Sequence, residues 1–180
     1  NGPALSLEPG GAAPGASVSC ASPDGAPGAA TFAAAYFGKL ATLFAKVDTA
    51  AIASVAQALL DARERGARIF VLGNGGSAAT ASHFANDIGI GTRTWDRPFR
   101  IVSLSDNAAV ITAIANDYGY DQVFTRQLAI QMLPWDVVIA ISASGNSANV
   151  VAAVEYANRA GGVTVGLTGF DARLPSELSG

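Results

Sequence analysis

The chain has 180 residues and half of them are hydrophobic, so it is long enough for one domain with a sizeable core. A formal net charge of -3 argues against a broad basic face and so against nucleic acid as a partner. The single cysteine, Cys20, excludes an internal disulfide framework and a multi-cysteine metal site, which indicates a reducing, cytoplasmic compartment.

Residues 1–30 are dominated by glycine, alanine, proline and serine. A segment of this composition cannot bury enough apolar surface to offset the entropy of ordering it, so we expect a disordered tail. No apolar run in the sequence approaches the roughly 18 residues of a membrane span. The first basic residue is Lys39, which argues against a secretory signal, and we expect no membrane partner.

Two helices are predicted before the first strand. The first covers residues 31–47, where Phe32, Tyr36 and Leu40 recur at helical spacing. The second is capped by Asp48 or Thr49 and runs to residue 67. Both helices could cover a sheet or pack against another subunit, and the sequence leaves these alternatives open.

Four short β-branched runs follow, at residues 68–72, 100–104, 137–141 and 163–167, and helical segments separate them. This alternation predicts an α/β fold, a three-layer αβα sandwich with a parallel, doubly wound, flavodoxin-like sheet. One of the helices is expected from about residue 121 to 132. Ligands bind beyond the carboxyl ends of such strands, so the loops at 73–77, 105–107 and 142–147 should share one edge.

The first of these loops predicts an anion site. Gly75 and Gly76 allow a sharp turn, and Ser77 is expected to cap the following helix, whose free N–H groups favour a phosphate. Further along that helix, His83 and Asp87 are four residues apart and so share one face, as an acid/base pair would. Two alternatives remain for the loop: a plain structural turn, and a dinucleotide site with the G-x-G-x-x-A pattern and Asp106 as its acidic residue.

The third loop favours a phosphate over a dinucleotide. It places three hydroxyls, those of Ser142, Ser144 and Ser147, at the start of another helix. Hydroxyl and N–H groups can surround a phosphate dianion without a lysine, and no Walker lysine follows either the glycine loop or the serine loop, which argues against an NTPase. The alternative, that serines serve as ordinary caps and turn residues, explains one or two of the three.

At these loops the chain resembles the sugar isomerase (SIS) domain family, and within it the phosphoheptose isomerase type. The resemblance covers residues 31–173 and depends on five stretches: 73–77, 82–87, 116–120, 141–150 and 168–171. It implies an aldose–ketose isomerase that converts sedoheptulose 7-phosphate to heptose 7-phosphate through an enediol. It further implies a homotetramer with sites at subunit interfaces, and zinc in some members.

The resemblance also assigns roles to individual residues. Those implied to hold the phosphate are Ser77, Ser142, Ser144 and Ser147, while Asn74 and Asp106 would touch the sugar. Asp87 takes the position of the family's catalytic glutamate, four residues after a histidine, and would be the base. His83 would orient it or, together with Asp87, bind zinc.

The resemblance ends near the C-terminus of the chain. The family continues with another strand and a long helix that carries a glutamine and a second histidine, whereas residues 170–180 here read as irregular and His83 is the chain's single histidine. We therefore expect an SIS domain over 31–180, with two N-terminal helices at 31–67 and a core at 68–169, lacking that strand and helix. The alternative function is a non-catalytic SIS regulator that binds a phosphosugar or a replication initiator.

Overall fold

The computed structural model describes residues 28–169, so the predicted tail up to residue 27 and the segment 170–180 lie outside the described residues. The chain divides into two compact units between Val47 and Asp48. The described part of the first unit, residues 28–47, contains helix α1, Ala29–Phe44, which has no buried residue. The helix begins two residues before the predicted helix and ends three residues earlier.

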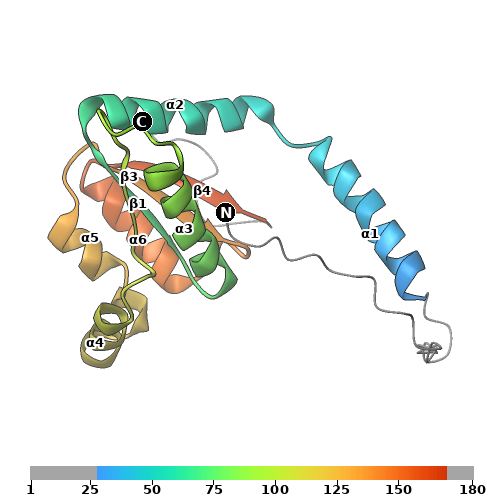
Figure 1. Cartoon of the computed structure of the whole chain (residues 1–180). Helices are drawn as coiled ribbons and strands as arrows, with labels where there is room; N and C mark the ends of the chain where they lie inside the picture. Colours follow the sequence, from blue (N-terminus) through green and yellow to red (C-terminus); the bar gives the residue numbers. More distant parts are fainter. Residues whose placement is uncertain (1–27, 170–180) are drawn as a thin grey trace, which may run out of the picture. The chain divides into compact units, whose positions relative to one another are not determined.

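The second unit contains a four-stranded parallel sheet (Figure 1). Its strands are β1 (Arg68–Gly73), β2 (Arg100–Ser103), β3 (Val137–Ser142) and β4 (Val163–Thr168), and their order across the sheet is β2-β1-β3-β4. Each strand agrees with its prediction to within one residue at either end. The parallel, doubly wound α/β fold is therefore confirmed.

The helices of the second unit follow the expected alternation with the strands. They are α2 (Thr49–Arg65), α3 (Gly76–Asn86), the π-helix η1 (Asp87–Gly91), α4 (Ala108–Tyr118), the 3-10 helix η2 (Tyr120–Gln122), α5 (Thr125–Gln131) and α6 (Ala148–Arg159). The Asp48 carboxylate caps α2 by accepting the N–H groups of Ala50 and Ala51.

The helix predicted from about residue 121 to 132 is confirmed only from residue 125 onward, and its start was placed too early. The structure has η2 and α5 instead, with a break at Val123 and Phe124. Both side chains are buried in the core, so tertiary packing outweighs the helical tendency of the local sequence.

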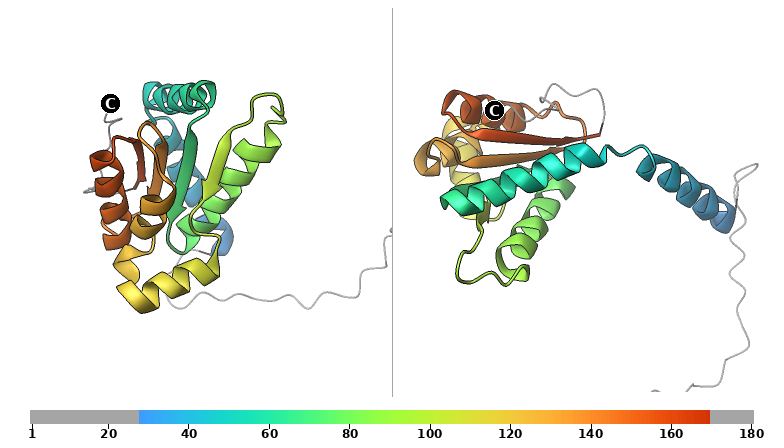
Figure 2. Two further views of the ribbon diagram at one scale, coloured as in Figure 1. Left: turned by 90° about the vertical axis from the view of Figure 1, so that its left-hand side faces the viewer. Right: turned by 90° about the horizontal axis from the view of Figure 1, so that it is seen from above.

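Helices cover both faces of the sheet, which makes three layers (Figure 2). On one face α2 and α3 pack against β1 and β3 through residues such as Leu59, Ala62 and Ala81. On the other face α4, α5 and α6 pack through Ile114, Leu128 and Ala153. The two central strands, β1 and β3, are apolar and buried on both faces, as strands between two helical layers must be.

Within residues 28–169 no single helix is long and apolar enough to cross a membrane. Helices α1 and α2 have the length and apolar composition of a membrane span only when they are counted together, and the chain bends between them.

Candidate functional site

The candidate site lies where the winding of the sheet reverses. The chain passes from β1 outward to β2, then returns to β3 and continues outward to β4 on the other side. The loops after β1 and β3 therefore emerge side by side at the carboxyl edge of the sheet. In open α/β sheets this position is the usual ligand-binding crevice.

Gly73 brings the two loops close together. A Cβ atom at this position would lie 2.8 Å from the carbonyl oxygen of Ile141 and 2.8 Å from the Cβ of Ser77. Gly75 then has a φ of +54°, in the left-handed region that favours glycine. Both glycines are thus required by the path of the backbone from β1 into α3.

Helix α3 begins two residues earlier than a cap at Ser77 would place it. Gly75 is its N-cap and Gly76 its first residue, so the prediction that Ser77 caps the helix is wrong. The carbonyl oxygen of Asn74 accepts the N–H of Ser77 at 2.9 Å and that of Ala78 at 3.3 Å, which completes the first turn. Ser77 lies within that turn, beside the exposed glycines that precede it.

The serine loop after β3 folds around the hydroxyl of Ser142. This oxygen accepts the N–H of Gly145 at 3.1 Å and lies 3.4 Å from the Oγ of Ser147. Gly145 has a φ of +65°, which turns the chain back toward α6. The Ser144 side chain is at the exposed outer side of the loop, where its Oγ accepts the N–H of Asn146 at 3.3 Å. Ser142 and Ser147 are thus brought together.

The start of α6 strengthens this arrangement. Ser147 is its N-cap, yet the Ser147 side chain caps no N–H group of the helix. The Ser147 hydroxyl therefore does not occupy the first N–H groups of α6, which a helix leaves without internal partners, and both lie at the same edge as the glycine loop. The arrangement can hold an anion by hydrogen bonds and by the helix dipole.

An amide pair joins the two loops. Asn74 Nδ2 donates to Asn149 Oδ1 at 2.8 Å, and Asn149 Nδ2 donates to Asn74 Oδ1 at 2.9 Å. The Tyr120 hydroxyl also donates to Asn74 Oδ1, at 3.1 Å. Sequence reasoning gave no role to Asn149 or Tyr120. Both occur in the stretches that carry the family resemblance, but spacing alone does not reveal contacts between loops so far apart.

Asp106 lies at the end of β2, on the other side of the glycine loop. Its Oδ1 accepts hydrogen bonds from the hydroxyls of Ser103, at 2.9 Å, and Ser82 of α3. The neighbouring Ser105 hydroxyl donates to the Gly73 carbonyl at 2.9 Å. Asp106 is thus held against α3, and the residue is exposed.

His83 and Asp87 form a pair on the exposed side of α3. Their Nε2 and Oδ2 atoms are 3.2 Å apart, and the side chains are 78% and 58% exposed. Asp87 ends α3 and begins η1, and it also accepts a hydrogen bond from Asn86 at 3.3 Å. Within residues 28–169 the two side chains make no hydrogen bond or ion pair with the serine loop.

A zinc site is not formed by these two residues alone. Among the described residues no three His, Cys, Asp or Glu side chains gather as metal ligands would. Structural zinc takes four protein ligands and catalytic zinc three, whereas His83 and Asp87 provide two. Zinc therefore stays a prediction, and the described residues do not fit it without further ligands.

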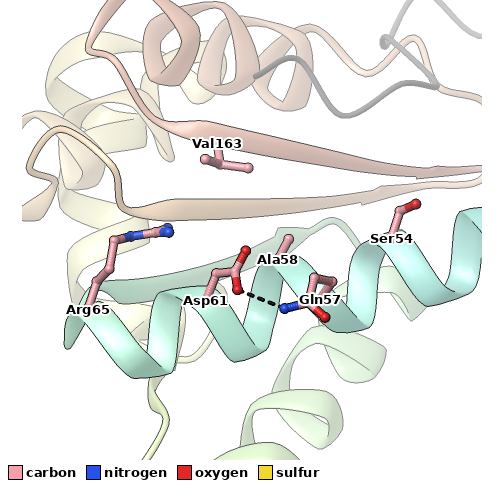
Figure 3. A pocket seen from close by; sticks show the side chains of 6 residues that line it. All are labelled: Ser54, Gln57, Ala58, Asp61, Arg65 and Val163. Carbon is pink, nitrogen blue, oxygen red and sulfur yellow. Dashed lines mark hydrogen bonds between the residues drawn. The ribbon is translucent and has the colours of Figure 1, made fainter.

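A separate cavity of about 330 Å³ lies between α2 and β4 (Figure 3). Ser54, Gln57, Ala58, Asp61, Arg65 and Val163 line it. Val163 is the first residue of β4, so the cavity reaches the amino ends of the strands, opposite the glycine and serine loops. It is not part of the candidate site.

Comparison with protein families identifies the chain. Residues 35–169 match the model of the SIS domain. The chain belongs to the SIS domain family. It is also similar to curated relatives: 44% identical over 133 residues to the phosphoheptose isomerase of Trichlorobacter lovleyi, covering 72% of this chain and 67% of that protein. A probable phosphoheptose isomerase of Thermoplasma acidophilum is 42% identical over 118 residues, covering 66% of this chain and 65% of that protein.

Solved structures agree with the family. A phosphoheptose isomerase from Neisseria gonorrhoeae superimposes with a TM-score of 0.69 at 36% identity, covering 81% of this chain and 74% of that one. One from Francisella tularensis gives a TM-score of 0.71 at 32% identity, covering 81% and 75%. This SIS chain spans about two thirds of the length of the curated relatives.

Proposed function

We propose that this SIS chain binds a sugar phosphate and isomerises it as phosphoheptose isomerases do, from sedoheptulose 7-phosphate to heptose 7-phosphate. The observation that carries the proposal is the paired glycine and serine loops at the reversal point of the sheet, where hydroxyl and N–H groups of two helix starts meet. Relatives named for this reaction, at 40–44% identity, support the choice of substrate.

In this proposal the phosphate binds to hydroxyl and N–H donors. Ser142 and Ser147 supply neighbouring hydroxyls, Ser144 the outer one, and Ser77 one from the first turn of α3. The N–H groups of Gly75 and Gly76 complete the cradle, because the first N–H groups of a helix lack partners within it. Asn74 and Asp106 lie on either side of Gly75 and Gly76 and bind the sugar.

The reaction moves one proton between adjacent carbons. A base removes the proton from C1 of the ketose, the C1–C2 enediol forms, and the proton is returned to C2 while the O1 proton is lost and O2 is protonated. Asp87 is the proposed base, and the His83 imidazole 3.2 Å away orients its carboxylate. An aspartate is one methylene shorter than the glutamate that the family has at this position. The distance from the Asp87 carboxylate to C1 of the sugar therefore controls the rate of proton transfer.

Three further assignments belong to the same proposal: a homotetramer, zinc as a cofactor and a cytoplasmic location. The tetramer matters for the chemistry, because the exposed His83–Asp87 pair has no other acid or base within hydrogen-bonding distance in the described chain. A neighbouring subunit would complete the set of groups that a proton transfer needs. No step of the reaction is derived through zinc.

Binding of the phosphate tests the site directly. Calorimetric titration with sedoheptulose 7-phosphate should give a dissociation constant at least about tenfold weaker in Ser144→Ala than in the parent, because a hydrogen bond to a charged group is lost. Ser54→Ala is the matched control, since Ser54 is an exposed serine of α2 whose hydroxyl bonds only its own helix. Equal affinity of Ser144→Ala and the parent would reject the phosphate assignment.

A phosphosugar-binding regulator is the second candidate function. It is favoured by the exposed His83–Asp87 pair, which stands apart from the serine loop in the described residues. A regulator would bind the sugar phosphate with the same loops and turn none of it over. Binding without turnover would therefore select this candidate.

A further inference from the structure

We propose that Tyr120 and Asn149 are positioning residues, which hold the side-chain amide of Asn74 in one orientation so that it offers an N–H donor to the ligand. The inference rests on the proposed function for the identity of the ligand. It concerns two residues to which neither the sequence motifs nor the chemistry above assigns a role.

The hydrogen bonds of Asn74 leave one group free. Its Oδ1 accepts from both Asn149 Nδ2, at 2.9 Å, and the Tyr120 hydroxyl, at 3.1 Å, so both lone pairs of the oxygen are used. Its Nδ2 donates one of two protons to Asn149 Oδ1 at 2.8 Å. What remains for a ligand is the second N–H, which matches an acceptor oxygen of a sugar.

Burial makes Asn149 the fixed half of this network. Asn149 is 3% exposed, at the second position of α6, whereas Asn74 is half-buried and reaches the edge of the site. A buried amide is costly without partners, so the reciprocal pair with Asn74 also satisfies Asn149. The orientation of the half-buried Asn74 amide is thus set by the buried amide of Asn149.

Tyr120 reaches Asn74 because of the turn before it. Gly119 has a φ of +94°, which ends α4 and directs the chain into η2, where Tyr120 is the first residue. Tyr120 is 56% exposed, so the hydrogen bond of its hydroxyl contributes little to the stability of the core. Its removal should therefore act on Asn74 rather than on folding.

A double-mutant cycle separates positioning from mere structure. We expect Tyr120→Phe to weaken binding of sedoheptulose 7-phosphate about fivefold in the parent, the usual effect of one neutral hydrogen bond, and to have no effect in the Asn74→Ala background. Tyr118→Phe is the matched control, because Tyr118 is 57% exposed and its ring stacks on Arg126. Unchanged affinity of Tyr120→Phe, or an equal loss in both backgrounds, would overturn the proposal.

A ligand-free measurement distinguishes this inference from the proposed function. The side-chain amide signal of Asn74 in a ¹H–¹⁵N NMR spectrum should shift in Tyr120→Phe and stay in place in Tyr118→Phe. If the parent binds no sugar phosphate, the proposed function fails, while the amide shift alone still decides whether Tyr120 holds Asn74. An amide signal that Tyr120→Phe leaves unmoved would overturn the inference even where the ligand binds.

Discussion

Trp135 has an uncommon backbone conformation for so large a residue. Its φ is +72° at the third position of a turn in which the Asp136 N–H bonds the Leu133 carbonyl at 3.2 Å and Pro134 precedes it. Such a turn normally has glycine or asparagine there. Because the side chain is 67% exposed, packing offsets little of the strain.

Replacing this tryptophan should stabilise the chain. Trp135→Gly should raise the free energy of unfolding by up to about 1 kcal/mol, since relief of roughly 1–2 kcal/mol of left-handed strain exceeds the added entropy of the unfolded chain. Urea unfolding measures the change. The other tryptophan, Trp95, is 65% exposed with no positive φ, so Trp95→Gly should give no gain. Equal effects of the two changes would contradict the strain argument.

Gly73 gives the opposite prediction. Gly73→Ala should destabilise the fold by about 1–3 kcal/mol, because its Cβ would meet the Ile141 carbonyl and the Ser77 Cβ at 2.8 Å. Gly76→Ala is the control, since a Cβ there meets nothing within 4 Å. Thermal unfolding of both variants checks this. A Gly73→Ala variant as stable as Gly76→Ala would mean that the two loops can separate without cost.

Residues of the site could be predicted from sequence to the extent that their partners are local. The glycines and serines predict two helix starts, because the residues that form a turn or cap a helix lie within a few positions of one another in the sequence. The predicted cap at Ser77 is wrong, because the Asn74 carbonyl accepts the N–H groups of Ser77 and Ala78 and no side chain caps the helix start. Tyr120 and Asn149 were missed because their contacts with Asn74 span 46 and 75 residues.

At the scale of elements, one buried carboxylate joins the start of β1 to the turn before β3. Asp136 is 4% exposed and accepts the N–H of Arg68 through Oδ1 and the N–H of Leu133 through Oδ2, both at 2.8 Å. It thereby fixes the register at the amino ends of two neighbouring strands.

Loss of this carboxylate should be costly. Asp136→Ala should lower the free energy of unfolding by about 2–4 kcal/mol, as two hydrogen bonds to a charged group are lost and their donors are left unpaired. Asp136→Asn keeps one acceptor and should cost less. The exposed Asp117→Ala is the control in the same denaturant titration. If Asp136→Ala unfolds at the same denaturant concentration as the parent, the carboxylate does not hold the strands in register.

The strands were predicted to within one residue because each is a short run rich in β-branched residues, and packing buries the two central strands, β1 and β3, on both faces. The helix predicted over 121–132 begins only at residue 125, after a turn at Val123 and Phe124 whose side chains are buried in the core. The hydrophobic pattern of a segment predicts its helix or strand correctly when the same residues are buried in the fold. The prediction fails where tertiary packing outweighs the helix or strand propensity of the local sequence.

At the scale of the whole molecule, the proposed tetramer can be tested through α1. This helix exposes large apolar side chains, among them Phe32, Phe37 and Phe44, at 61%, 66% and 72%. Exposed apolar groups of this size mark protein interfaces. Light scattering should give four times the 18.1 kDa mass of the chain, and Phe37→Ser should reduce it. A monomeric parent would reject the tetramer.

Turnover of sedoheptulose 7-phosphate tests the central claim most directly. The aldose product should appear with the parent chain, and Asp87→Asn should lower kcat by at least about a hundredfold, the scale of loss expected when the acid/base group is removed. Asp61→Asn is the matched control, because Asp61 is an exposed aspartate of α2 far from the glycine and serine loops. A parent that binds the sugar phosphate yet forms no aldose would contradict the isomerase and leave the regulator.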